Sequence, residues 1–136
     1  MKKKNIYGLY SVLAGLFLWP SLLLAQDKLK NLEQVQFLSQ NVCVVVQVNA
    51  DWNKNSSLDL GNMDNCQWFH ASIDNKEYGA IIAKEWNIRS VPTIIMFEKG
   101  KEIKRFEAGL SFTLDPDDIK RKIEKEIDNI MLRRFQ

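Results

Sequence analysis

A run of apolar residues from Val42 to Val48 constrains the fold of this chain most. Five of its seven residues are valines, which favour extended backbone, and the other two are Cys43 and Gln47. An uninterrupted apolar run of this length is typical of a strand that is buried on both faces, because neither face can be left to water. The rest of the chain must therefore supply helices that cover two sides of a sheet.

The remaining segments alternate between helical and strand patterns. Apolar residues recur at helical spacing in three places, and runs of β-branched and aromatic residues mark three further strands, the last two joined by a hairpin turn. The order α-β-α-β-α-β-β-α predicts an α/β fold, with a central mainly parallel four-stranded sheet, an antiparallel edge hairpin and helices on both faces. We expect the strands at 42–48, 66–73, 93–97 and 102–106, and the helices at 28–40, 75–86 and after Asp115.

The first 25 residues have the pattern of a secretory signal peptide. Three lysines at positions 2–4 precede an apolar stretch over 6–24, and the small residue Ala25 follows it. We predict that residues 1–25 are removed and that residues 26–136 form one exported domain, periplasmic or extracellular. The alternative is that residues 6–24 stay in place as a membrane anchor, since their length approaches that of a membrane-spanning helix.

The charge balance gives no indication of nucleic acid binding. Without the three lysines of the predicted signal peptide, sixteen basic residues stand against seventeen acidic ones, a net charge of −1. We also predict no cofactor, since no phosphate-binding loop or dinucleotide glycine motif is present. His70 is the only histidine and lies about 13 Å along its predicted strand from Cys66, so we predict no metal site.

Three local motifs follow one another between residues 44 and 101. The first is Val44–Trp52, VVVQVNADW, which resembles the central strand and the start of the active-site loop of thioredoxins. Trp86–Thr93, WNIRSVPT, resembles the approach to the cis-proline, and Phe97–Lys101, FEKGK, resembles the hairpin that follows. The chain therefore resembles the thioredoxin-like family over most of residues 41–109. This resemblance implies a thioredoxin-like domain over 26–136, without a counterpart of the family's N-terminal strand.

The residues that carry the family's chemistry are replaced in this chain. Asn53 and Ser56 stand where the resemblance places the two cysteines of the CxxC motif. Gln47 stands in place of the buried acid, and His70 in place of its lysine partner. Disulfide exchange needs an attacking thiolate and a second thiol, which an amide and a hydroxyl cannot replace. The resemblance therefore implies a degenerate site with no catalytic residues.

The part of the site that remains is the cis-proline loop. In the family, the residue before that proline pairs through its main chain with an extended peptide, and here that residue is Val91, before Pro92. We predict a non-catalytic module that binds a peptide or partner protein through Trp52, Asn53, Ser56, Val91 and Pro92. The proline isomer stays open at this stage, and a purely structural domain is an alternative.

The two cysteines allow three interpretations. On the resemblance, Cys43 and Cys66 lie at the starts of neighbouring parallel strands, each four residues before Gln47 or His70 and on the same face. We expect two buried free thiols. A disulfide is the alternative, because neighbouring strands are about 4.8 Å apart, near the lower end of disulfide Cα separations. The third interpretation is an atypical thiol-disulfide oxidoreductase that acts through Cys66 or Cys43.

Overall fold

The computed structural model describes residues 27–60 and 63–136, so the predicted signal peptide and the alternative anchor lie outside the described residues. Within these two ranges, none of the helices has the length and apolar character needed to cross a membrane. The elements in chain order are β1 (Asp27–Lys28), α2 (Leu32–Leu38), β2 (Cys43–Asn49), the 3-10 helix η2 (Asp51–Ser56), β3 (Cys66–Ser72), α3 (Gly79–Glu85), β4 (Thr93–Glu98), β5 (Lys101–Glu107), the 3-10 helix η3 (Gly109–Ser111) and α4 (Pro116–Arg134).

The strands form one mixed sheet in the order β1-β3-β2-β4-β5. β3 runs parallel to β1 and β2, whereas β4 runs antiparallel to both β2 and β5. The α/β class, the buried central strand and the antiparallel edge hairpin are confirmed. The prediction of a mainly parallel four-stranded sheet is met only in part, because the sheet has a fifth strand, β1, and two of its four strand pairings are parallel. Burial on both faces does not reveal strand direction, because helices cover β4 as fully as β2.

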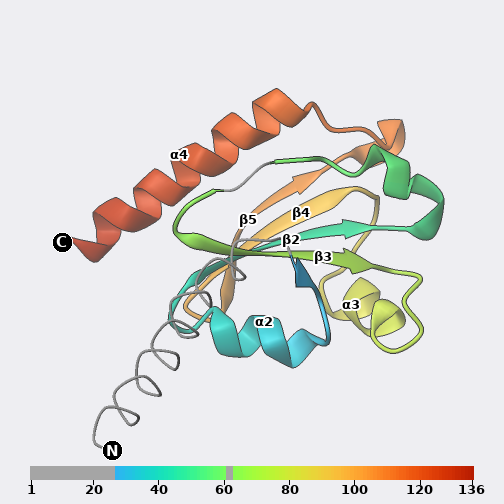
Figure 1. Cartoon of the computed structure of the whole chain (residues 1–136), viewed down its shortest axis with the longest axis horizontal. Helices are drawn as coiled ribbons and strands as arrows, with labels where there is room; N and C mark the ends of the chain where they lie inside the picture. The colour runs from blue at the N-terminus through green and yellow to red at the C-terminus, as the bar shows by residue number, and fades with distance from the viewer. Residues whose placement is uncertain (1–26, 61–62) are drawn as a thin grey trace, which may run out of the picture.

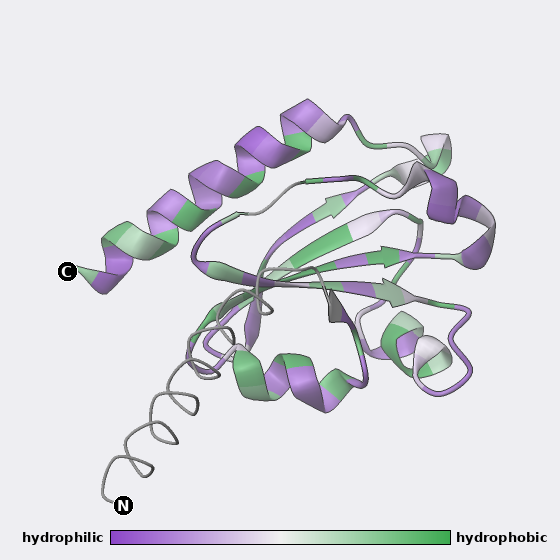
Figure 2. Ribbon diagram, viewed as in Figure 1, coloured by the Kyte–Doolittle hydropathy of each residue, from purple (hydrophilic) through white to green (hydrophobic). Residues whose placement is uncertain are grey.

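Helices cover both faces of the sheet, with α4 on one side and α2 and α3 on the other (Figure 1). Alternate residues of each central strand point to opposite sides and form two separate cores. Val45, Ile94 and Met96 pack under α4, whereas Val44 and Ile95 pack under α2 and α3. Hydrophobic colour accordingly concentrates along the central strands, while α4 alternates between hydrophilic and hydrophobic segments (Figure 2).

The predicted helix over 28–40 is shorter in the structure, because two other features occupy its start. Asp27 and Lys28 form β1, which pairs with Phe69 and His70 of β3. The helix begins only after Asn31, whose side chain accepts a hydrogen bond from the Gln34 N–H at 2.8 Å. The expected absence of an N-terminal strand is therefore wrong, since a strand of two residues is too short to show a pattern.

The C-terminal helix follows its sequence signals closely. The Asp115 side chain accepts a hydrogen bond from the backbone N–H of Asp117 at 3.0 Å, and Pro116 takes the first helical position. The far end of α4 is held by an ion pair between Arg133 and the buried Glu98 at 3.0 Å. The buried stripe of α4 consists of Ile119, Ile123, Ile127 and Ile130.

The segment over residues 57–65 connects η2 to β3, and the structure describes it except for residues 61 and 62. It runs back along the α4 side of the sheet toward the start of β3 (Figure 1). Leu58, Leu60 and Met63 from this segment are buried in the core under α4. These three side chains fill space between the sheet and α4. Leu58 is hydrogen-bonded to Gln47, and Cys66 at the start of β3 is bonded to Cys43.

Candidate functional site

Three connections meet at one end of the sheet, and the predicted site residues lie on two of them. The first is η2 after β2, the second is the turn into β4, and the third is the link from β5 to α4. The Gly109 N–H donates to Ser90 Oγ at 3.1 Å, and the Ala108 N–H donates to the Pro92 C=O at 3.2 Å. The peptide bond between Val91 and Pro92 is cis.

Asn53 caps its own helix. Its Oδ1 accepts a hydrogen bond from the backbone N–H of Ala50 at 2.8 Å, and only 4% of the residue is exposed. Its Nδ2 has no hydrogen-bond partner among the described residues. Ser56, three residues later, is exposed. No thiol is present at either position, so η2 holds no group that can attack a disulfide.

The Gln47 amide forms a buried hydrogen-bond network. Its Nε2 donates to the Leu58 C=O at 3.0 Å, and its Oε1 accepts from the Leu58 N–H at 2.8 Å. The same oxygen accepts from the Ser57 hydroxyl and from the Asn49 amide, both at 3.1 Å. Gln47 therefore attaches the segment after η2 to the central strand, which is a structural role.

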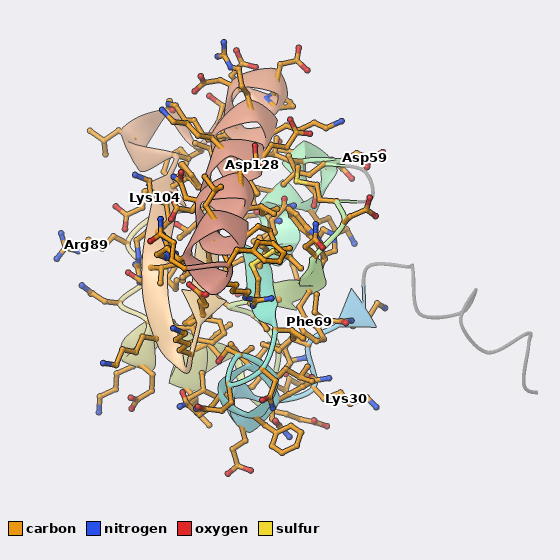
Figure 3. The ribbon with its side chains drawn as sticks, turned by 90° about the vertical axis from the view of Figure 1, so that its left-hand side faces the viewer. Lys30, Asp59, Phe69, Arg89, Lys104 and Asp128 are labelled. Carbon is orange, nitrogen blue, oxygen red and sulfur yellow. A yellow bond between two sulfur atoms is a disulfide. The ribbon has the colours of Figure 1, made fainter. Side chains whose placement is uncertain are left out.

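His70 lies beside Gln47 in the parallel pairing of β2 and β3, as the resemblance implies. Burial lowers the pKa of His70 below its ordinary value, and the negative charge of Asp59 partly opposes this effect. Figure 3 shows Asp59 on the segment beside α4. Within residues 27–60 and 63–136, no three His, Cys, Asp or Glu side chains are grouped so that they could hold a metal ion.

Three exposed apolar residues lie on two of these connections, Trp52 on η2 and Leu110 and Phe112 on the link from β5 to α4. Trp52 is 65% exposed and meets the ring of Phe112 edge-on, with centroids 5.3 Å apart. Phe112 is 43% exposed, and Leu110, two residues earlier in the chain, is 96% exposed. Our sequence reasoning named Trp52 but missed Leu110 and Phe112. The sequence feature that could have located them is the presence of two large apolar residues in the short link between Gly109 and the α4 cap.

The cis-proline turn contributes main-chain groups more than side chains. Val91 and Pro92 are both buried. The Val91 N–H and C=O form no hydrogen bond within the part of the chain that the structure describes. Arg89, two residues earlier, points away from the body of the molecule (Figure 3). Of the five predicted binding residues, Trp52 and Ser56 therefore offer exposed side chains, and the other three are buried.

Cys43 and Cys66 form a disulfide, with Cα atoms 4.5 Å apart. The expectation of two free thiols is therefore wrong. The pairing of β2 with β3 sets Cys43 directly opposite Cys66, and both side chains turn toward α4. Cys43 is 1% exposed. The disulfide lies at the start of β2, about 20 Å along that strand from the cis-proline end.

Several solved structures have a fold similar to that of this chain. A thioredoxin from Malassezia sympodialis matches with a TM-score of 0.59 at 20% identity, over 76% of this chain and 91% of that one. A cysteine-to-serine mutant of Entamoeba histolytica thioredoxin matches with a TM-score of 0.58 at 22% identity, over 74% and 99%. The chain has the thioredoxin fold.

Mitochondrial thioredoxin 3 of Saccharomyces cerevisiae shows the same fold, with a TM-score of 0.53 at 18% identity over 74% of this chain and 94% of that one. No family model and no curated protein matches the sequence. At these identities the likeness covers the thioredoxin fold alone. This chain differs from the CxxC pattern because its two cysteines are 23 positions apart and pair with each other across β2 and β3.

Proposed function

We propose that this protein is an exported, non-catalytic thioredoxin-fold module that binds an extended peptide or protein segment. The binding surface is the exposed cluster of Trp52, Leu110 and Phe112 beside the main chain of Val91. The observation that carries the proposal is the edge-on contact between the exposed rings of Trp52 and Phe112. The link that holds Phe112 is hydrogen-bonded to the cis-proline turn through Ala108 and Gly109.

The chemistry of the site supports binding over catalysis. Asn53 is used as a helix cap and Gln47 as a buried anchor, so neither residue is available for proton or thiol chemistry. Both sulfur atoms are joined to each other, and Cys43 is almost fully buried. A reactive cysteine needs exposure and a lowered pKa.

The surface has the features of a protein contact site. Large exposed aromatic side chains are enriched among the residues that dominate binding energy at interfaces. An extended peptide that paired with the free N–H and C=O of Val91 would gain two main-chain hydrogen bonds, as in strand addition. Its neighbouring side chains would then lie against Trp52, Leu110 or Phe112, which would select for apolar residues.

The test is selection of peptides from a random displayed library, followed by affinity measurements with purified variants. We expect Trp52→Ala to weaken binding of selected peptides by about 10- to 30-fold, as for a central interface residue. Phe135→Ala is the matched control, because Phe135 is 83% exposed at the end of α4. Its affinity should stay within twofold of the wild type. Methylation of the peptide nitrogen that faces Val91 should also weaken binding.

Equal affinity of the wild type and a folded Trp52→Ala variant would remove this surface from the proposal. If Trp52→Ala lost binding but backbone methylation had no effect, the apolar cluster would be supported as a binding surface. The proposed main-chain pairing with Val91 would then be contradicted.

Export is the second part of the proposal. The pattern over residues 1–25 supports it, and so does the disulfide, since such bonds persist mainly in oxidising compartments. Mass spectrometry of the protein recovered from outside the cytoplasm should give an N-terminus at Gln26. Recovery only in the membrane fraction with residues 6–24 intact would favour the anchor.

A further inference from the structure

The face of the sheet under α2 and α3 has a hollow that is separate from the cis-proline end. α2 and α3 have seven residues each, about 10 Å of helix, and together they leave part of this face open. The hollow between them has a volume of about 350 Å³. This volume lies near the lower end of ligand pockets, so it suits one or two side chains.

The floor of the hollow is apolar and aromatic. Val35 and Phe97 are buried at its base, and Leu32 and Trp86 are half-buried along its sides. The rings of Trp86 and Phe97 lie 5.3 Å apart with planes tilted by 47°. An aliphatic stem could pack along this floor without leaving a polar group unpaired.

The rim of the hollow is acidic. Glu33 from α2 and Glu85 from α3 are both exposed, and the one remaining lining residue, Gln36, is neutral. Over residues 27–60 and 63–136, neither glutamate takes part in an ion pair. The rim therefore carries two negative charges without a cation of its own.

The cation that contacts Trp86 does not neutralise this rim. Arg105 of β5 donates to the Trp86 C=O at 2.5 Å, but its other bonds go to Glu102, Glu107 and the Asn87 C=O. Hydrogen bonding to Glu102 raises the pKa of Arg105 further, so Arg105 stays charged. Glu33 and Glu85 are left for a partner.

We infer that this hollow binds an arginine or lysine side chain from an apolar-basic segment of a partner protein. The stem of such a side chain would lie on Leu32, Val35 and Phe97, as long cationic side chains do on apolar surfaces. Its charged end would lie between Glu33 and Glu85 and against the face of Trp86, where cation–π attraction adds to the ion pairs.

The test is a nuclear magnetic resonance titration of the full chain with a synthetic peptide of alternating arginine and leucine residues. We expect the chemical shift of the Trp86 indole N–H to change with peptide concentration until it reaches a plateau. The chemical shift of the Trp52 indole N–H should not change. Glu33→Gln/Glu85→Gln should weaken binding by about fivefold, as expected for two exposed ion pairs. A peptide with glutamate in place of arginine should leave Trp86 unmoved.

Glu77→Gln/Glu124→Gln is the matched control, because it removes the same two charges from exposed positions outside this hollow. Equal weakening by both double variants would mean attraction to the overall charge and would overturn the inference. A shift of the Trp52 signal alone would also overturn the inference. This outcome is independent of the peptide-library test of the proposed function. No movement of Trp86 up to millimolar peptide would have the same consequence.

Discussion

The side chain of Gln47 meets both the N–H and the C=O of Leu58, and this pair of contacts sets what the position can hold. An amide has a donor and an acceptor, so it satisfies both groups at once. An ionised carboxylate has acceptors only and would leave the Leu58 C=O facing a negative charge. The replacement of an acid by an amide here therefore gives the segment after η2 a fixed anchor.

Gln47→Glu should lower the free energy of unfolding by about 1–3 kcal/mol at pH 7, since one buried hydrogen bond is lost and a carboxylate is buried. The loss should shrink as the pH falls, because a protonated Glu can donate to the Leu58 C=O. Urea unfolding at pH 7 and pH 5 measures both effects. Gln40→Glu, at an exposed position, is the control. An unfolding free energy equal to that of the wild type at both pH values would show that the Gln47 network does not anchor this segment.

His70 should make stability depend on pH in a window where no other side chain ordinarily titrates. Its pKa is lower in the folded state than in the unfolded chain, mainly through burial. The unfolded chain therefore binds more protons as the pH falls through about 6.5, and the free energy of unfolding should decrease from pH 7.5 to 5.5.

His70→Asn should flatten this pH dependence. Urea unfolding of both proteins at half-unit intervals measures it. A steeper loss in the variant would mean that protonated His70 is stabilised in the folded state, with Asp59 outweighing burial.

At the scale of elements, β2 and β3 are the strands before and after η2 in the chain. They pair in parallel over seven residues, and the disulfide joins their first residues. The whole of η2 and the segment after it lie between the two cysteines in sequence. The bond therefore restricts the conformations that this segment can adopt in the unfolded chain.

Reduction of the disulfide should lower the free energy of unfolding by about 3 kcal/mol, the loop-entropy value for cysteines 23 positions apart. Thermal unfolding with and without dithiothreitol measures the change in midpoint. Cys43→Ala/Cys66→Ala should unfold earlier than the wild type and should not respond to dithiothreitol. If dithiothreitol did not change the unfolding midpoint of the wild type either, the cysteines would not be bridged.

Long elements were predictable from sequence, and short ones were not. The valine run fixed the central strand, and the isoleucine stripe with Asp115 and Pro116 fixed α4, because both patterns extend over many residues. β1 has two residues and no pattern. The direction of β4 was missed because its burial on both faces looks the same in either orientation.

The candidate site was predictable where the resemblance applied. Its motifs located Trp52, Val91 and Pro92 at one end of the sheet. Leu110 and Phe112 were missed because they lie in a link whose position depends on the tertiary fold. The cysteine positions predicted a shared face, but only the register of β2 and β3 brings their Cα atoms to 4.5 Å.

At the scale of the whole molecule, the candidate contacts and the disulfide lie in different places. The apolar cluster is at the cis-proline end, the acidic hollow is under α2 and α3, and the disulfide is at the far end of β2. A thioredoxin fold with this distribution has no free thiol at the surface where we propose that a peptide binds. Binding without thiol-disulfide exchange is therefore the expected behaviour.

The most direct measurement is the rate at which the purified protein reduces insulin disulfides in the presence of dithiothreitol. The comparison is with Cys43→Ser/Cys66→Ser, at a temperature where circular dichroism shows both proteins folded. We expect both rates to equal the background of dithiothreitol alone. A wild-type rate above background that disappears in the double variant would show that one of these cysteines has taken over the chemistry, and would contradict a non-catalytic module.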